Sequence, residues 1–406
     1  MPTPVSSEIA GATGVDSGRA WLIVAATFIS TFTGFGLIYS FGAFFDSMAR
    51  EFGTGRAATA FMLALTSAIY FLLGMITGRL GDRVGPRPLL ITSAVTLAAG
   101  MIATSKVDSI YAGYATYGLG LGIAIACAYV PMVAFVGGWF VRRRTAAIGV
   151  AVSGIGIGTL VVAPLSQTLI ERYGWRQSFV ILGIGGAIMM LVAAAIAKAP
   201  PLQAHEQTGR SVAQLIRDRS FISLHLSGVL IGIAILVPFV FIKNYAVGRG
   251  IDARAAALLV GLIGASSVIG RLGLGTLGSR FDPIGLLKLS FIIQTLSYLL
   301  WLFAGSSYLL LVLFAITMGV GYGGFIALMP AAAASIFGAV GLGTTLGFLY
   351  TSAAVGGLIG PTLVGAVIDA TSYSVGISVL IVVTGLSTIC LYFIRTTSTS
   401  GDAAHA

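Results

Sequence analysis

Long apolar runs alternate with short polar segments along the whole chain. A helix that crosses the hydrocarbon core of a bilayer needs about 20 mostly apolar residues. Read with that window, the sequence predicts twelve such helices, at residues 20–45, 58–78, 88–105, 110–136, 145–170, 177–198, 221–243, 255–279, 284–304, 307–336, 343–368 and 375–395.

The longest polar segment inside the chain, residues 199–220, divides these helices into two sets of six. We therefore predict an all-α membrane protein with two six-helix bundles, at residues 20–198 and 221–395, joined by a cytoplasmic linker at 199–220. Residues 1–19 and 396–406 are expected to be cytoplasmic tails.

Composition and charge agree with a chain that is solvated mainly by lipid. Of the 406 residues, 57% are hydrophobic and only 9% are charged, whereas soluble domains carry about 25% charged residues. The net charge of +10 comes mostly from loop Lys and Arg, so it does not indicate nucleic acid. With both termini cytoplasmic, fourteen Lys and Arg flank the cytoplasmic side and eight the opposite side, which is the expected bias. The short linker and small loops are typical of a multi-pass protein of the bacterial inner membrane.

Side chains that could form a catalytic or metal centre are scattered. Cys127 and Cys390 lie in separate apolar runs, and His205, His225 and His405 are far apart in the sequence. Catalysis needs several ionisable or nucleophilic groups at one place. We therefore predict that the protein is not an enzyme and has no cofactor.

The two sets of helices carry an internal sequence repeat. Residues 78–86 (GRLGDRVGP) are echoed by residues 275–283 (GTLGSRFDP) at an offset of 197, and Pro164 is matched by Pro361 at the same offset. Such repeats are typical of duplicated transporter folds. The repeat predicts pseudo-two-fold symmetry between the bundles.

The repeated loop also predicts a gate at the cytoplasmic face. Gly78 allows close helix approach, and Asp82 and Arg83 can pair with a neighbouring helix end and so hold one conformation. Arg280 occupies the corresponding place in the second half. The alternative is a solvated loop whose arginines only set the topology.

Residues 78–90 resemble the loop between spans two and three of the major facilitator superfamily, and the twelve spans extend this resemblance over the whole chain. Residues 139–154 (WFVRRRTAAIGVAVSG) resemble the signature of the monocarboxylate porter family, and residues 16–21 (DSGRAW) are similar to a degraded copy of its second signature. The resemblance implies a monomer in the lipid bilayer that moves a lactate- or pyruvate-like monocarboxylate by alternating access, as a symporter with a proton. Alternatives are an anion exchanger of the oxalate/formate type and a facilitator-type exporter of another small molecule.

Arg271 is the charged residue that falls deep within a predicted span. It lies nine residues before Arg280, on the order of 13 Å from the cytoplasmic end of the span. An arginine at that depth costs at least about 2.5–3.5 kcal/mol, and all acidic residues fall in loops, tails or span ends. A bound carboxylate would supply two parallel hydrogen bonds to the guanidinium. The alternative is that Arg271 snorkels or binds backbone carbonyls; the resemblance implies a substrate-binding arginine at this position.

Three tyrosines are further candidates for substrate binding. Tyr322 lies in a glycine-rich segment of span ten, and the resemblance implies that it contacts substrate through its phenol group. Tyr129 in span four and Tyr39 in span one are the others, with structural packing as the alternative for each.

The acidic residue that the resemblance implies one helical turn before Arg271 is replaced by Ser267. Proton coupling would then depend on the substrate's own carboxyl group, whereas anion exchange needs no such acid. A single buried positive charge balances a single negative charge, because a second carboxylate would be costly to desolvate. This argument favours a monocarboxylate.

Overall fold

The computed structural model describes residues 16–18, 20–140, 144–199, 212–278, 280–338 and 342–394. All regular secondary structure within these ranges is helical. The predicted tails, apart from residues 16–18, and most of the predicted linker lie outside them. The helices of the first half are α2 (Ala20–Tyr39), α3 (Phe41–Phe52), α4 (Arg56–Val84), α5 (Pro86–Thr104), α6 (Ile110–Gly113), the π-helix η1 (Tyr114–Leu119), α7 (Gly120–Ala128), α8 (Val130–Trp139) and α9 (Arg144–Ile196). Those that follow are α10 (Val212–Leu215), α11 (Arg219–Ile235), α12 (Val237–Gly248), α13 (Ala253–Leu277), α14 (Pro283–Phe303), α15 (Tyr308–Phe337), α16 (Leu342–Ala370), α17 (Tyr373–Cys390) and the short 3₁₀-helix η2 (Leu391–Phe393).

The described residues contain twelve membrane crossings, which confirms the predicted number. Eleven segments are long and apolar enough to cross a membrane, and the one at Ala146–Ile196 has 51 residues. At 1.5 Å per residue that segment would be about 77 Å long, more than twice the hydrocarbon core of about 30 Å. The chain reverses inside it at Gly174, where φ is 75° and ψ is 165°. Glycine adopts this positive φ without the strain that a Cβ would cause, so α9 contains crossings five and six.

Three crossings are interrupted inside the membrane. Crossing one breaks at Ser40 between α2 and α3, crossing four at Tyr129 between α7 and α8, and crossing seven at Leu236 between α11 and α12. Pro131 and Pro238 lie in the first turn of the helix that follows two of these breaks. Proline is tolerated there because its missing N–H is not needed at the start of a helix.

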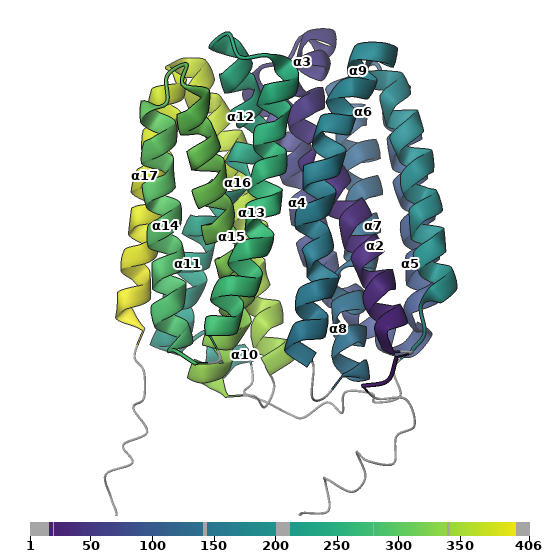
Figure 1. Ribbon diagram of the computed structural model, residues 1–406, viewed down its shortest axis with the longest axis vertical. Coiled ribbons are helices and arrows are strands. Elements are labelled where there is room, and N and C mark those ends of the chain that lie inside the picture. Colours follow the sequence, from purple (N-terminus) through teal and green to yellow (C-terminus); the bar gives the residue numbers. More distant parts are fainter. Residues whose placement is uncertain are drawn as a thin grey trace, which may run out of the picture.

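The first half lies beside the second half, and the two meet along lengthwise contacts of α4 with α16 and of α9 with α13. In Figure 1 the first half is coloured from purple through blue to teal, and the second half from teal through green to yellow. We call the end where α3 and α12 lie the far end, and the end where α2 begins and α10 lies the near end.

At the far end α3 also contacts α12. A Cβ on Gly42 would lie only 2.5 Å from the carbonyl oxygen of Phe239, so glycine is required for this close approach of the two backbones. The halves are therefore in backbone contact at the far end.

Candidate substrate site between the two halves

Arg271 lies in the interface between the halves, with only 4% of its surface exposed. Its Nη1 donates a 2.6 Å hydrogen bond to the carbonyl oxygen of Val152 in α9. Its Nε and Nη2 are buried and have no hydrogen-bond partner among the described residues. Backbone bonding, the alternative considered for this residue, thus accounts for one nitrogen of the guanidinium. The Nε–Nη2 edge is left for another acceptor, and a carboxylate fits such an edge with two parallel hydrogen bonds.

Tyr322 and Tyr39 lie next to this guanidinium. The Cζ of Arg271 is 5.8 Å from the centroid of the Tyr322 ring, and the Oη atoms of Tyr322 and Tyr39 are 2.7 Å apart. Both tyrosines are more than nine-tenths buried. The hydrogen bond links α15 of the second half to α2 of the first. Residues predicted from three separate spans therefore come together in one cluster.

Close packing of α13 against α15 positions Arg271 and Tyr322. A Cβ on Gly270 would overlap the carbonyl oxygen of Val320, and one on Gly323 would overlap that of Ser267. Small residues of this kind allow membrane helices to approach closely. The glycine-rich segment of span ten thus brings the phenol of Tyr322 to the arginine.

Aromatic rings surround the two tyrosines. Phe239 of α12 stacks on Tyr39, with centroids 4.1 Å apart and planes at 18°. Phe35 contacts Tyr39 and also packs edge-on against Tyr129, with centroids 4.9 Å apart, and against Tyr70. Tyr129 therefore joins the cluster through Phe35 and makes no described bond to Arg271. Sequence reasoning missed Phe239 and Tyr70, because neither differs in pattern from other aromatic residues in apolar spans.

Two ion pairs connect the halves at the far end. Arg56 at the start of α4 pairs with Asp369 of α16 at 2.8 Å, and Arg254 at the start of α13 pairs with Glu171 of α9 at 2.7 Å. Arg254 follows Arg56 by 198 residues, and Asp369 follows Glu171 by the same number. The pairs are thus related by the internal repeat. The sequence contains a signal for them, namely opposite charges that recur at nearly the repeat offset.

The helix of span seven continues beyond its predicted end at Lys243. The predicted span, residues 221–243, ends at this residue, and Lys243 is one of the eight cations counted on the side opposite the cytoplasm. Instead α12 continues to Gly248, and only 6% of the surface of Lys243 is exposed. Its Nζ donates to the carbonyl oxygen of Ala43 in α3, 3.1 Å away. The prediction was wrong because a window of hydropathy treats a lysine as the end of a span, whereas α3 covers this one.

The predicted near-end gate is described only in part. Gly78 lies inside α4, where a Cβ would be in ordinary contact with Val130 of α8. Arg83 and Arg280 are exposed, and neither forms an ion pair with any residue in the described ranges. The side chain of Asp82 lies outside the described residues. Gating by these residues stays a prediction.

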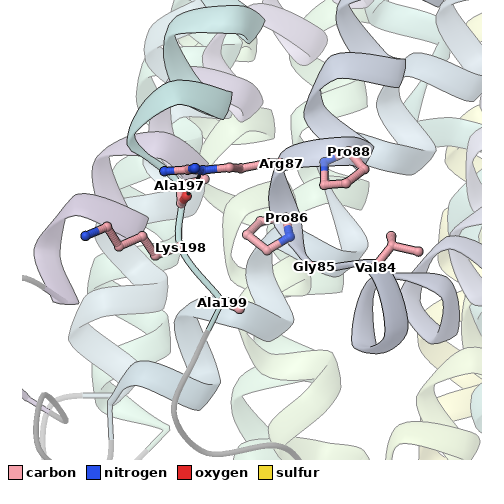
Figure 2. Close-up of a pocket in the computed structure, with 8 residues that line it drawn as sticks. All are labelled: Val84, Gly85, Pro86, Arg87, Pro88, Ala197, Lys198 and Ala199. Carbon is pink, nitrogen blue, oxygen red and sulfur yellow. Dashed lines mark hydrogen bonds between the residues drawn. The ribbon is translucent and has the colours of Figure 1, made fainter.

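A pocket of about 530 Å³ lies at the near end, away from Arg271. Figure 2 shows its lining, which comes from the end of α4, the start of α5 and the chain after α9. Arg87 donates from Nε to the carbonyl oxygen of Ala197 and from Nη2 to that of Ala195. A basic side chain is favourable beside the unpaired carbonyls at a helix C-terminus, so these bonds explain Arg87 as part of the structure.

The model of the Major Facilitator Superfamily matches residues 26–307. Monocarboxylate transporter 3 of Rattus norvegicus is 30% identical over 375 residues, which cover 89% of this chain and 76% of that protein. The chain belongs to the monocarboxylate transporter family of this superfamily. It is a multi-pass membrane protein, and its relatives are transporters.

Other members of the family match over a similar length. Monocarboxylate transporter 4 of Rattus norvegicus is 29% identical, over 89% of this chain and 80% of that protein. The fold also resembles a crystal structure of a bacterial homologue of the human lysosomal transporter Spinster, inward-facing and occupied. The TM-score is 0.71 at 16% identity, and the match covers 93% of this chain and 96% of that one. This likeness concerns the fold alone. It agrees with the predicted all-α fold of two six-helix bundles.

One helical turn before Arg271, this chain has Ser267 and therefore a hydroxyl group instead of a carboxylate. Ser267 is fully buried, and its Oγ donates a 2.7 Å hydrogen bond to the carbonyl oxygen of Gly264 in its own helix. No described carboxylate forms an ion pair with Arg271. The guanidinium therefore keeps its positive charge uncompensated within the described part of the chain.

Proposed function

We propose that the protein is a secondary transporter that moves a small monocarboxylate across the membrane by alternating access, with Arg271 as the carboxylate-binding residue. The buried Nε–Nη2 edge of Arg271, which lacks a partner among the described residues, carries this proposal. A buried charge is costly unless it is paired and hydrogen-bonded, and a carboxylate provides both. The names of the relatives support the same substrate class.

The surroundings of the arginine favour a small acid with an apolar remainder. Tyr322 and Tyr39 offer phenol groups to a carboxylate oxygen, while Phe239 and Phe35 present only rings. The other buried cation, Lys243, lies beyond the Tyr39–Phe239 stack and is bonded to a backbone carbonyl. A dicarboxylate at Arg271 would therefore have one carboxylate without a cation in this conformation.

Alternating access is supported by the way in which the far end is held closed. The pairs Arg56–Asp369 and Arg254–Glu171 both join the first half to the second. In the proposed cycle these ion pairs and the Tyr39–Tyr322 hydrogen bond break when the far end opens.

Proton symport is the coupling that we propose, with the substrate's own carboxyl group as the proton acceptor. Anion exchange is the second candidate, and the absence of a described carboxylate beside Arg271 favours it, because exchange needs no protein acid. The two differ in their driving force: a proton gradient drives symport, whereas exchange requires anion on the opposite side.

Uptake of labelled lactate into proteoliposomes tests the proposal, with the wild type, Arg271→Gln and Arg217→Gln. Arg217 is an exposed arginine in the turn between α10 and α11, so its variant is the matched control. We expect gradient-driven uptake in the wild type and control and none in Arg271→Gln. Uptake that does not depend on the proton gradient but requires anion inside the vesicles would indicate exchange instead of symport. Undiminished uptake by Arg271→Gln would refute the assignment of the site.

A further inference from the structure

Lys243 is a second buried cation in the interface, and the site around Arg271 does not use it. Its ammonium group has three donors, and the described residues supply one acceptor, the carbonyl oxygen of Ala43. No carboxylate of the described part lies within 4.0 Å of its Nζ. Asp46 and Arg50 of α3 and Glu171 of α9 act on its charge through space.

The position of Lys243 places it between the far face and Arg271. Phe239 precedes Lys243 by four residues in α12. Phe239 therefore lies about one helical turn, or about 6 Å, deeper in the membrane than Lys243. Phe239 stacks on Tyr39, which is bonded to Tyr322 beside Arg271. The two buried cations therefore lie on opposite sides of the Tyr39–Phe239 stack, and Lys243 is on its far side.

The bond that holds Lys243 joins the two halves at the far end. Ala43 belongs to α3 in the first half and Lys243 to α12 in the second, and the backbones touch at Gly42. Opening the far end separates α3 from α12, so the ammonium group loses its acceptor at the moment when the interface is exposed. A charged donor in that position attracts an anion from the far side.

We propose that Lys243 is a second anion-binding residue, which binds the incoming carboxylate when the far end opens and transfers it past the Tyr39–Phe239 stack to Arg271. This inference rests on the proposed function. Closure then returns the ammonium group to the carbonyl oxygen of Ala43, and the carboxylate is released toward the stronger, two-point site at Arg271. Lys243 acts in capture, and Arg271 acts in binding at the centre.

A cysteine at position 243 separates the charge of this residue from its packing. The chain has two cysteines, Cys127 and Cys390, and both are first changed to serine. Lys243→Cys is then treated with a thiosulfonate that adds an aminoethyl group, which restores the ammonium, or with one that adds a neutral methyl group. Lys106→Cys is the matched control, because Lys106 is an exposed lysine in the loop between the far ends of α5 and α6. The assay is lactate uptake from the far side.

We expect the KM of Lys243→Cys to rise about tenfold, the effect of one charge-assisted hydrogen bond. The aminoethyl group should restore the KM and the methyl group should not, and lactate should slow the reaction of the cysteine with both reagents. A KM that falls in Lys243→Cys would mean that Lys243 only stabilises the closed far end, and an unchanged KM would mean no role; either overturns the inference. If Arg271→Gln is inactive while Lys243→Cys is normal, the proposed function survives and the role of Lys243 fails. If the wild type takes up no carboxylate, both fail.

Discussion

Replacement of Arg271 by lysine tests whether the site recognises a carboxylate through two bonds or only through charge. The change keeps a positive charge at the same depth but removes the planar Nε–Nη2 edge, which is buried and without a described partner. It also removes the bond from Nη1 to Val152, which fixes the orientation of the guanidinium. A lysine is a point charge on a flexible stem and cannot reproduce a bidentate pair.

The expected loss is that of one of two charge-assisted hydrogen bonds, about 1.5–3 kcal/mol, or about a 10- to 150-fold rise in the Kd for lactate. Equilibrium binding of labelled lactate to purified protein in detergent measures it, with Arg217→Lys as the control. Arg271→Gln should bind more weakly still, because it also removes the charge. If Arg271→Lys bound lactate as tightly as the wild type while Arg271→Gln did not bind, charge alone would suffice and the two-point geometry would be refuted.

Three other predictions concern the closed far end and the core of the second half. Arg56→Asp removes an exposed ion pair that contributes about 0.2–1 kcal/mol and places a second carboxylate beside Asp369, so opening should be favoured about fivefold or more. Adding Asp369→Arg should reverse the change. Spin-label distances between the far ends of α3 and α12 measure it, and a double variant that opens as readily as the single one contradicts the prediction. Tyr39→Phe removes the hydrogen bond to Tyr322 and should favour opening about 2- to 10-fold in the same measurement, with no change if the phenol group has no part in closure. Gln294 is fully buried, and both of its amide atoms lack hydrogen-bond partners among the described residues. Gln294→Met should therefore stabilise the protein by about 1 kcal/mol. A thermal midpoint of Gln294→Met below that of the wild type would contradict this, because it would mean that the amide forms hydrogen bonds in the folded protein.

The number of crossings could be predicted from sequence because each crossing is a local property. Lipid offers no hydrogen bonds, so every spanning segment must be a long apolar helix. The predicted gap between spans five and six contains Gly174, where the chain reverses even though α9 continues on both sides. The breaks at Ser40 and Leu236 were not predicted, because a break that is buried in protein leaves the hydropathy of its span unchanged.

The burial of Arg271 inside a span could be predicted, because a charge within an apolar run is conspicuous. The partners of a side chain are a different matter, since they depend on which helices touch. From sequence alone Lys243 marks the end of a span, whereas in the structure it is covered by α3. Likewise Glu171 and Arg254 are 83 residues apart, and the sequence shows them only as two separate loop charges. Their ion pair forms because the two halves pack together.

Among the described residues, the interactions between the halves are unequal along the interface, as the proposed two-state cycle requires. In this part of the chain, the bonds that join the halves through side chains gather at the far end and around Arg271 and the Tyr39–Tyr322 contact. The two ion pairs are related by the repeat and connect different helix pairs, α4 with α16 and α9 with α13. A rigid rotation of one half against the other therefore strains both pairs together, and neither can hold the far end closed after the other has parted. Because exposed ion pairs are individually weak, the closed state can be left at small cost. In the proposed cycle, a carboxylate bound at Arg271 would then decide the balance between the two states.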